Sequence, residues 1–84
     1  MLVGAQIRSA RAALGWSLDD LAKNSGVSLS TIRRAELAHG VPKTTVPNLE
    51  ALKSALETAG IEFIGAPGDA PGIRIHTPDD PQSP

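Results

Sequence analysis

Two short helices joined by a very brief connection constrain the fold of this chain more than any other feature. Ser17 stands where a helix N-cap belongs, and the helix that it starts is predicted to stop at about Asn24. Gly26 then supplies a left-handed turn, and Ser28 caps a second helix that is predicted to run to about Leu37. Only about three or four residues separate the two helices, which favours a crossing of about 90 to 120°.

Apolar residues at helical spacing predict one helix before this pair and one after it. The earlier helix ends at Gly15, and Gln6 falls outside its apolar spacing. The later helix starts from a cap at Thr45 and is closed by Gly60. The apolar positions of these two helices are Val3, Ile7, Ala10, Leu14, Leu49, Leu52, Leu56 and Ala59.

The segment after Gly60 predicts a small β-hairpin. Two short alternating runs, Ile61 with Phe63 and Ile73 with Ile75, lie on either side of a loop rich in proline and glycine. A hairpin alone is marginal and has open edges, so it should pack on the helices or pair with its copy in a second subunit. In the second case these four apolar residues form a dimerisation element.

The size of the chain also points to a partner. A chain of 84 residues without cysteine is held by packing alone, and a second copy would contribute strongly, so we expect a homodimer. Arg8 and Arg11 interrupt the N-terminal apolar residues before they form a secretory signal or a membrane span. We therefore expect a soluble, cytoplasmic protein with no membrane contact.

Charge is divided unevenly along the chain. Residues 1–45 carry six basic and three acidic residues, a net charge of +3. Residues 46–84 carry two basic and six acidic residues, a net charge of −4. Because phosphates attract lysine and arginine, a nucleic acid would bind the first part and not the second.

The helix capped by Ser28 has one polar face. If Ile32 points to the core, a turn of about 100° per residue puts Glu36 beside it and Leu37 on the outside. Hydroxyl and guanidinium groups occupy the rest of the helix surface, and such groups suit the major groove and its phosphates. This surface consists of Leu29 on the flank, with Ser30, Thr31, Arg33 and Arg34.

The run from Gly15 to Glu36 resembles the helix-turn-helix of Cro/phage-repressor-type (XRE family) transcriptional regulators, and the similarity extends over residues 3–76. Leu21-Ala22, Gly26-Val27-Ser28 and Thr31-Ile32 stand in the family's register. The resemblance implies a mostly α, four-helix, lambda-repressor-like domain with a C-terminal hairpin. The expected parts are a DNA-binding domain at 1–60, a hairpin at 61–76 and a disordered tail at 77–84.

The resemblance also implies roles for single residues. Leu29, Ser30 and Arg34 would face base edges, with Thr31 and Arg33 at phosphates or neighbouring bases. An ion pair between Arg11 and Glu36 would fix the angle of the recognition helix, and Glu36 beside inward-facing Ile32 would need such a partner. The remaining members of the predicted DNA-binding set are Ser17, Ser28 and Lys43.

The chain departs from the family pattern at several positions. Leu18 stands where relatives often carry a glutamine that contacts phosphate, so that contact is either lost or replaced by Ser17 and nearby backbone N–H groups. Leu37 and Gly40 fall where many relatives have basic residues, and Leu29 favours contact with a thymine methyl group. We therefore expect weaker non-specific binding and a strong reliance on dimerisation.

Other kinds of site are not supported by the sequence. His39 and His76 stand alone, so no metal site is expected, and Asp79-Asp80 lie in a proline-bound tail that would not hold a catalytic geometry. The loop GAPGDAPG lacks the lysine and helix of a phosphate-binding loop. Trp16 is interpreted as a core residue. We expect no cofactor and no enzymatic activity.

The sequence thus predicts a dimeric regulator that binds an inverted-repeat operator through the major groove, as a repressor or autoregulator. One alternative is an antitoxin or anti-activator whose acidic C-terminal half binds a partner protein while the helix-turn-helix regulates its own operon. A second is an interaction module that has lost DNA binding.

Overall fold

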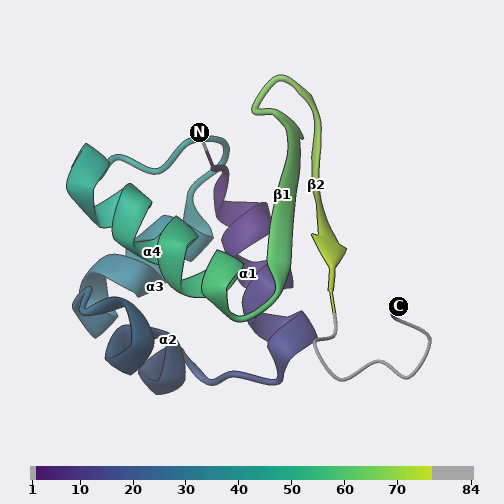
Figure 1. The fold of residues 1–84 in the computed structure, drawn as a ribbon. Coiled ribbons are helices and arrows are strands. Elements are labelled where there is room, and N and C mark those ends of the chain that lie inside the picture. Colours follow the sequence, from purple (N-terminus) through teal and green to yellow (C-terminus); the bar gives the residue numbers. More distant parts are fainter. Residues whose placement is uncertain (1, 77–84) are drawn as a thin grey trace.

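The computed structural model describes residues 2–76, and these residues form four helices followed by one hairpin (Figure 1). The predicted fold class, a mostly α helix-turn-helix domain with a C-terminal β-hairpin, is confirmed. The predicted tail at 77–84 lies outside the described residues. The elements are α1 (Gly4–Leu14), α2 (Leu18–Ser25), α3 (Leu29–Leu37), α4 (Val46–Thr58), β1 (Ile61–Ala66) and β2 (Asp69–Ile75).

Local hydrogen bonds explain where the helices begin and end. The hydroxyl oxygens of Ser17, Ser28 and Thr45 each accept the backbone N–H three residues later, which satisfies donors that the first helical turn leaves free. Gly15 and Gly26 have φ values of 69° and 75°, so the chain leaves α1 and α2 through a left-handed residue. The predicted boundaries of α2 and α3 agree with the structure to within one residue.

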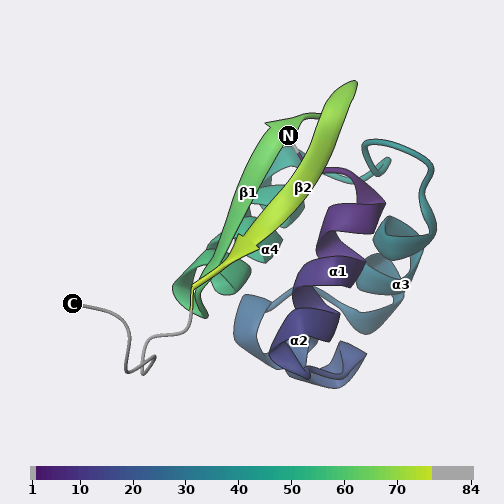
Figure 2. The same cartoon turned by 90° about the vertical axis from the view of Figure 1, so that its right-hand side faces the viewer.

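The core lies between the four helices and the inner face of the hairpin. Its largest fully buried side chains come from every helix: Ile7, Leu21, Ile32, Leu52 and Leu56. Trp16 is half-buried and packs against this core. α1 lies in the middle of the molecule, with α3 on one side and the hairpin on the other (Figure 2).

The hairpin packs on the helices of its own chain, which is the first of the two arrangements that the sequence allowed. β1 lies against α4 and β2 against α1. The antiparallel register pairs Ile61 with Ile75 and Phe63 with Ile73, so all four side chains share one face. Ile61 is buried and Phe63 and Ile73 pack against the core, whereas Ile75 at the end of the strand is 54% exposed.

The polar side chain of Gln6 is part of the core, and the sequence expectation that it lies off the buried side of its helix is wrong. Gln6 is only 2% exposed. Its Oε1 accepts the N–H of Val3 at 2.9 Å, and its Nε2 donates to the carbonyls of Ile64 at 3.2 Å and Gly72 at 2.9 Å. The amide is buried because it bonds the backbone of both strands, and it thereby ties the hairpin to α1.

Candidate nucleic-acid interface

The turn between α2 and α3 consists of residues 26–28 and is held by both local bonds and burial. Val27 is 5% exposed and anchors the turn in the core. The hydroxyl of Ser25 donates to the carbonyl of Leu21 at 2.7 Å, and its oxygen accepts the N–H of Val27 at 3.2 Å. These contacts fix the direction in which α3 leaves the turn.

α3 is divided along its length into a buried side and an open side. Ile32, Ala35 and Glu36 are buried, and they seat the helix against the core. On the open side, Ser30, Arg33, Arg34 and Leu37 are exposed, and Leu29 and Thr31 are half-buried. Of the five residues that the sequence assigned to this surface, Ser30, Arg33 and Arg34 are therefore exposed, and Leu29 and Thr31 lie at its half-buried margins.

The start of α3 presents two hydroxyl groups that are bonded to each other. Ser28 Oγ accepts the N–H of Thr31 at 3.3 Å and donates to Thr31 Oγ1 at 2.8 Å. The remaining N–H groups of this first turn have no intrahelical acceptor and carry the positive end of the helix dipole. This end of α3 is therefore suited to approach a phosphate.

The far end of α3 is tied to α1 by an ion pair. Arg11 Nε donates to Glu36 Oε2 at 2.8 Å, and Arg11 Nη2 donates to Glu36 Oε1 at 3.0 Å. The Glu36 side chain is 6% exposed and the Arg11 side chain 24% exposed. The hydrogen bond to Glu36 raises the pKa of Arg11 above its ordinary value. Arg11 Nη1 also donates to the carbonyl of Trp16 at 2.9 Å, so one guanidinium connects α1, α3 and the turn before α2.

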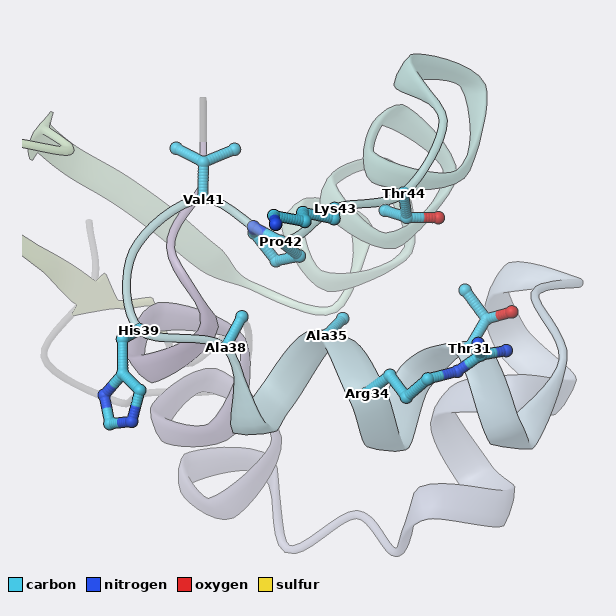
Figure 3. Close-up of a pocket in the computed structure, with 9 residues that line it drawn as sticks. All are labelled: Thr31, Arg34, Ala35, Ala38, His39, Val41, Pro42, Lys43 and Thr44. Atoms are coloured by element: carbon cyan, nitrogen blue, oxygen red, sulfur yellow. The ribbon is translucent and has the colours of Figure 1, made fainter.

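A groove that the sequence did not reveal runs between α3 and the connection to α4. It has a volume of about 510 Å³. Figure 3 shows Arg34 and Thr31 on the α3 side and Lys43 and Thr44 on the opposite side, with the Arg34 guanidinium lying next to Thr31. Arg34 Nε makes one weak bond, at 3.5 Å, to the carbonyl of Ser30. Within residues 2–76, neither Arg34 nor Lys43 forms an ion pair, so both cations are free to meet an external anion.

The remaining sequence-predicted residue, Ser17, lies at the start of α2. Its hydroxyl caps that helix and is exposed. Lys43 is brought to the same groove as Arg34 by the chain reversal at 38–44, where Pro42 is buried. No motif in the sequence indicated this reversal, and its only local signals were the turn-forming residues Gly40 and Pro42.

Two further findings concern the described part of the chain alone. No helix in it is long and apolar enough to cross a bilayer. Among residues 2–76 there is also no cluster of three or more histidine, cysteine or acidic side chains suited to a metal ion.

A short helix pair joined by a tight turn that is anchored by one buried residue, and whose second helix exposes hydroxyl and guanidinium groups, defines a helix-turn-helix domain. A family model described as a helix-turn-helix domain matches residues 2–63 of this chain. The chain therefore belongs to this helix-turn-helix family, and the match supports a function as a DNA-binding regulator. A comparison with curated proteins found no match.

Proposed function

We propose that this protein is a sequence-specific transcriptional regulator of the Cro/phage-repressor (XRE) type, acting in the cytoplasm as a homodimer. The observation that carries the proposal is the division of α3, in which Ile32 and Glu36 are buried while Arg33 and Arg34 are exposed. A helix held on one side and basic on the other can enter a major groove without loss of its packing.

In this proposal the outer residues of α3 contact different parts of the DNA. Leu29, Ser30 and Arg34 face base edges, where arginine can bond guanine and leucine can contact a thymine methyl group. Thr31 and Arg33 lie at the sides of the helix and contact phosphates or neighbouring bases. Ser17 and Ser28, at the starts of α2 and α3, approach the backbone together with the N–H groups of their helices.

The groove beside α3 supports a phosphate contact for Lys43. Its two sides carry Arg34 and Lys43, and threonine hydroxyls add hydrogen-bond donors on both sides. When α3 lies in the major groove of the DNA, the phosphate backbone at the edge of that groove would lie over the protein groove that contains Lys43. In this arrangement Arg34 can bond either a guanine or a phosphate, and the Arg34→Ala variant distinguishes the two contacts.

A dimer of such domains binds an inverted repeat, with half-sites about one helical turn of DNA, ~34 Å, apart. Regulation then works by occupancy of the operator, as repression or autoregulation. No catalytic step and no cofactor are part of the proposal.

The proposal is tested by mobility shifts on the DNA upstream of the protein's own gene, with excess competitor DNA. We expect a shifted band for the wild-type protein, a weaker one for Arg34→Ala, and an unchanged one for Lys53→Ala. Lys53 is the control because it is a basic residue on α4, outside both the proposed DNA-binding set and the strands of the hairpin. If no upstream sequence outcompetes unrelated DNA, the regulator proposal is wrong.

A second candidate is an antitoxin or anti-activator that also binds DNA. It is favoured by the net charge of −4 on residues 46–84 and by the apolar residue Val46, which is 57% exposed at the start of α4. This candidate predicts a stoichiometric complex with the product of a neighbouring gene, measurable by calorimetry with both purified proteins. Absence of heat at concentrations of about 100 μM would remove it.

A further inference from the structure

Within residues 2–76, no other strand covers the outer edge of β2. The sheet in this part of the chain contains β1 and β2 alone, and in Figure 2 no helix or strand lies in front of β2. The N–H of His76 donates to the carbonyl of Gly60 at 2.7 Å, which makes this a hydrogen-bonded pair of the ladder. Because such pairs alternate, the backbone N–H and C=O groups of Ile73 and Ile75 point to the open edge.

A small groove lies beside the open edge of β2, and the exposed apolar residue Ile75 lies further along the same strand. The groove has a volume of about 80 Å³ and is lined by Ala5, Gln6, Ser9, Pro71, Gly72 and Ile73. Small residues of α1 therefore leave space next to the strand. Ile75 lies on the same face of β2 as Pro71 and Ile73, yet it is 54% exposed.

We propose that the occupant of this edge is β2 of a second copy of the chain, running antiparallel with Ile73 opposite the partner's Ile73. The proposal rests on the homodimer in the proposed function and assigns its interface. The two strands then form a four-stranded sheet, and the side chain of each Ile75 lies opposite Pro71 of the other copy. Each Ile75 enters the small groove of the other copy and contacts Ala5 and Ser9 there.

Backbone chemistry fits this register. Ile73 exchanges two hydrogen bonds with the partner's Ile73, and the N–H of each Ile75 donates to the opposite Pro71 carbonyl. Proline has no N–H, so the register leaves only one acceptor per copy without a donor. Pairing also removes the open edge that makes a lone hairpin liable to aggregate.

The main competing register is less favourable. A shift that sets Ile73 opposite the partner's Ile75 places the two Arg74 side chains directly opposite each other, and like charges in that position are destabilising. It also leaves the groove without an apolar side chain. In the proposed register Arg74 lies opposite the partner's Gly72, and each Arg74 keeps its own Glu62 at 3.2 Å.

The interface is tested first by Ile75→Asp in the full chain. We expect the dissociation constant of the dimer, measured by sedimentation equilibrium, to rise at least about 100-fold, because two buried isoleucines are lost per dimer. Ile64→Asp is the matched control, since Ile64 is 37% exposed on the opposite face of the hairpin, and it should leave the constant unchanged. Should Ile75→Asp fail to fold, Ser9→Phe fills the groove from α1 and is expected to weaken the dimer likewise.

The register is tested with single cysteines, which the chain otherwise lacks. Gly72→Cys is sterically possible, because a Cβ there would meet only the Ile64 side chain at 3.6 Å. In the proposed register Gly72 and the partner's Arg74 form a non-hydrogen-bonded pair with Cα atoms about 4.5 Å apart, within disulfide range. We expect a mixture of Gly72→Cys and Arg74→Cys proteins to cross-link under mild oxidation, and neither protein to do so alone.

The outcomes separate the interface from the proposed function. A wild-type protein that is monomeric at all concentrations would overturn both this interface and the homodimer of the proposed function. An Ile75→Asp or Ser9→Phe protein with the wild-type dissociation constant, or cross-linking of Arg74→Cys alone, would overturn this interface only. A wild-type dimer that cross-links as described and yet binds no operator would instead overturn the DNA-binding proposal and leave the interface intact.

Discussion

Arg11 of α1 and Glu36 of α3 are joined by two parallel hydrogen bonds of 2.8 and 3.0 Å, with the carboxylate almost fully buried. The pair connects the centre of the molecule to the end of the helix that we propose to read DNA. A bidentate contact of this kind fixes both distance and orientation, so it controls how α3 is presented as well as how stable the fold is.

We expect Glu36→Ala to lower the free energy of unfolding by about 1–3 kcal/mol, because it leaves the Arg11 guanidinium partly buried without its carboxylate. The value lies below that of a fully buried pair because Arg11 still reaches solvent and the Trp16 carbonyl. Urea denaturation measures the change. Glu62→Ala, which removes an exposed ion-paired carboxylate on the hairpin, serves as the control and should leave the urea midpoint unchanged.

Gln6→Ala is expected to cost about 1–3 kcal/mol of stability, although the residue replaced is polar. The variant leaves the N–H of Val3 and the carbonyls of Ile64 and Gly72 without the amide that now bonds them. Hydrogen exchange should show the loss concentrated in the hairpin and the first turn of α1. Arg8→Ala, an exposed change on the same helix at a residue that lines neither groove, provides the comparison, and equal effects of the two would contradict a bracing role for Gln6.

Arg34→Ala should cost about 1–3 kcal/mol of binding at one base pair and relax selectivity there, if Arg34 bonds a base edge. Selection of bound sequences from a random pool measures this directly. Loss of affinity that is uniform across sequences would assign Arg34 to the phosphate side of the groove.

Lys43→Ala is expected to weaken binding about equally for all sequences and to reduce the slope of log affinity against log salt by about 1. The reason is that Lys43 lines the side of the groove opposite α3, and its charge has no ion-pair partner within residues 2–76. Titrations at several salt concentrations give the slope. An altered base preference in the variant would show that Lys43 reads sequence.

The start of α2 predicts a specific dependence on acid. The N–H of Ser17 donates to Asp20 Oδ2 at 2.9 Å, and this bond, followed by the Ser17 side chain, lowers the pKa of Asp20. A carboxyl group whose pKa is lowered by folding stabilises the fold above its unfolded pKa, about 3.9, and this contribution is lost as the pH falls through the folded pKa. Asp20→Asn should therefore flatten the decline of Tm between about pH 5 and 2. Asp19→Asn, beside it, should retain the decline.

Much of the fold could be predicted because its signals are local. Ser17, Ser28 and Thr45 cap their helices through bonds to residues three positions away, and Gly15 and Gly26 end theirs through their own backbone conformation. The outer face of α3 followed from one assumption, that Ile32 is buried, and from the angular step of a helix. These features require no knowledge of distant residues.

The helices, their ends, the hairpin strands and the open side of α3 therefore follow from local signals in the sequence. The burial of Gln6, the packing of the hairpin on its own helices, and the presence of Lys43 and Arg34 in one groove depend on how distant segments fold together. These features involve contacts between residues that are far apart in the sequence. Gln6, for example, donates to carbonyls 58 and 66 residues away, and the residues next to a glutamine do not indicate which backbone segment will pack against it.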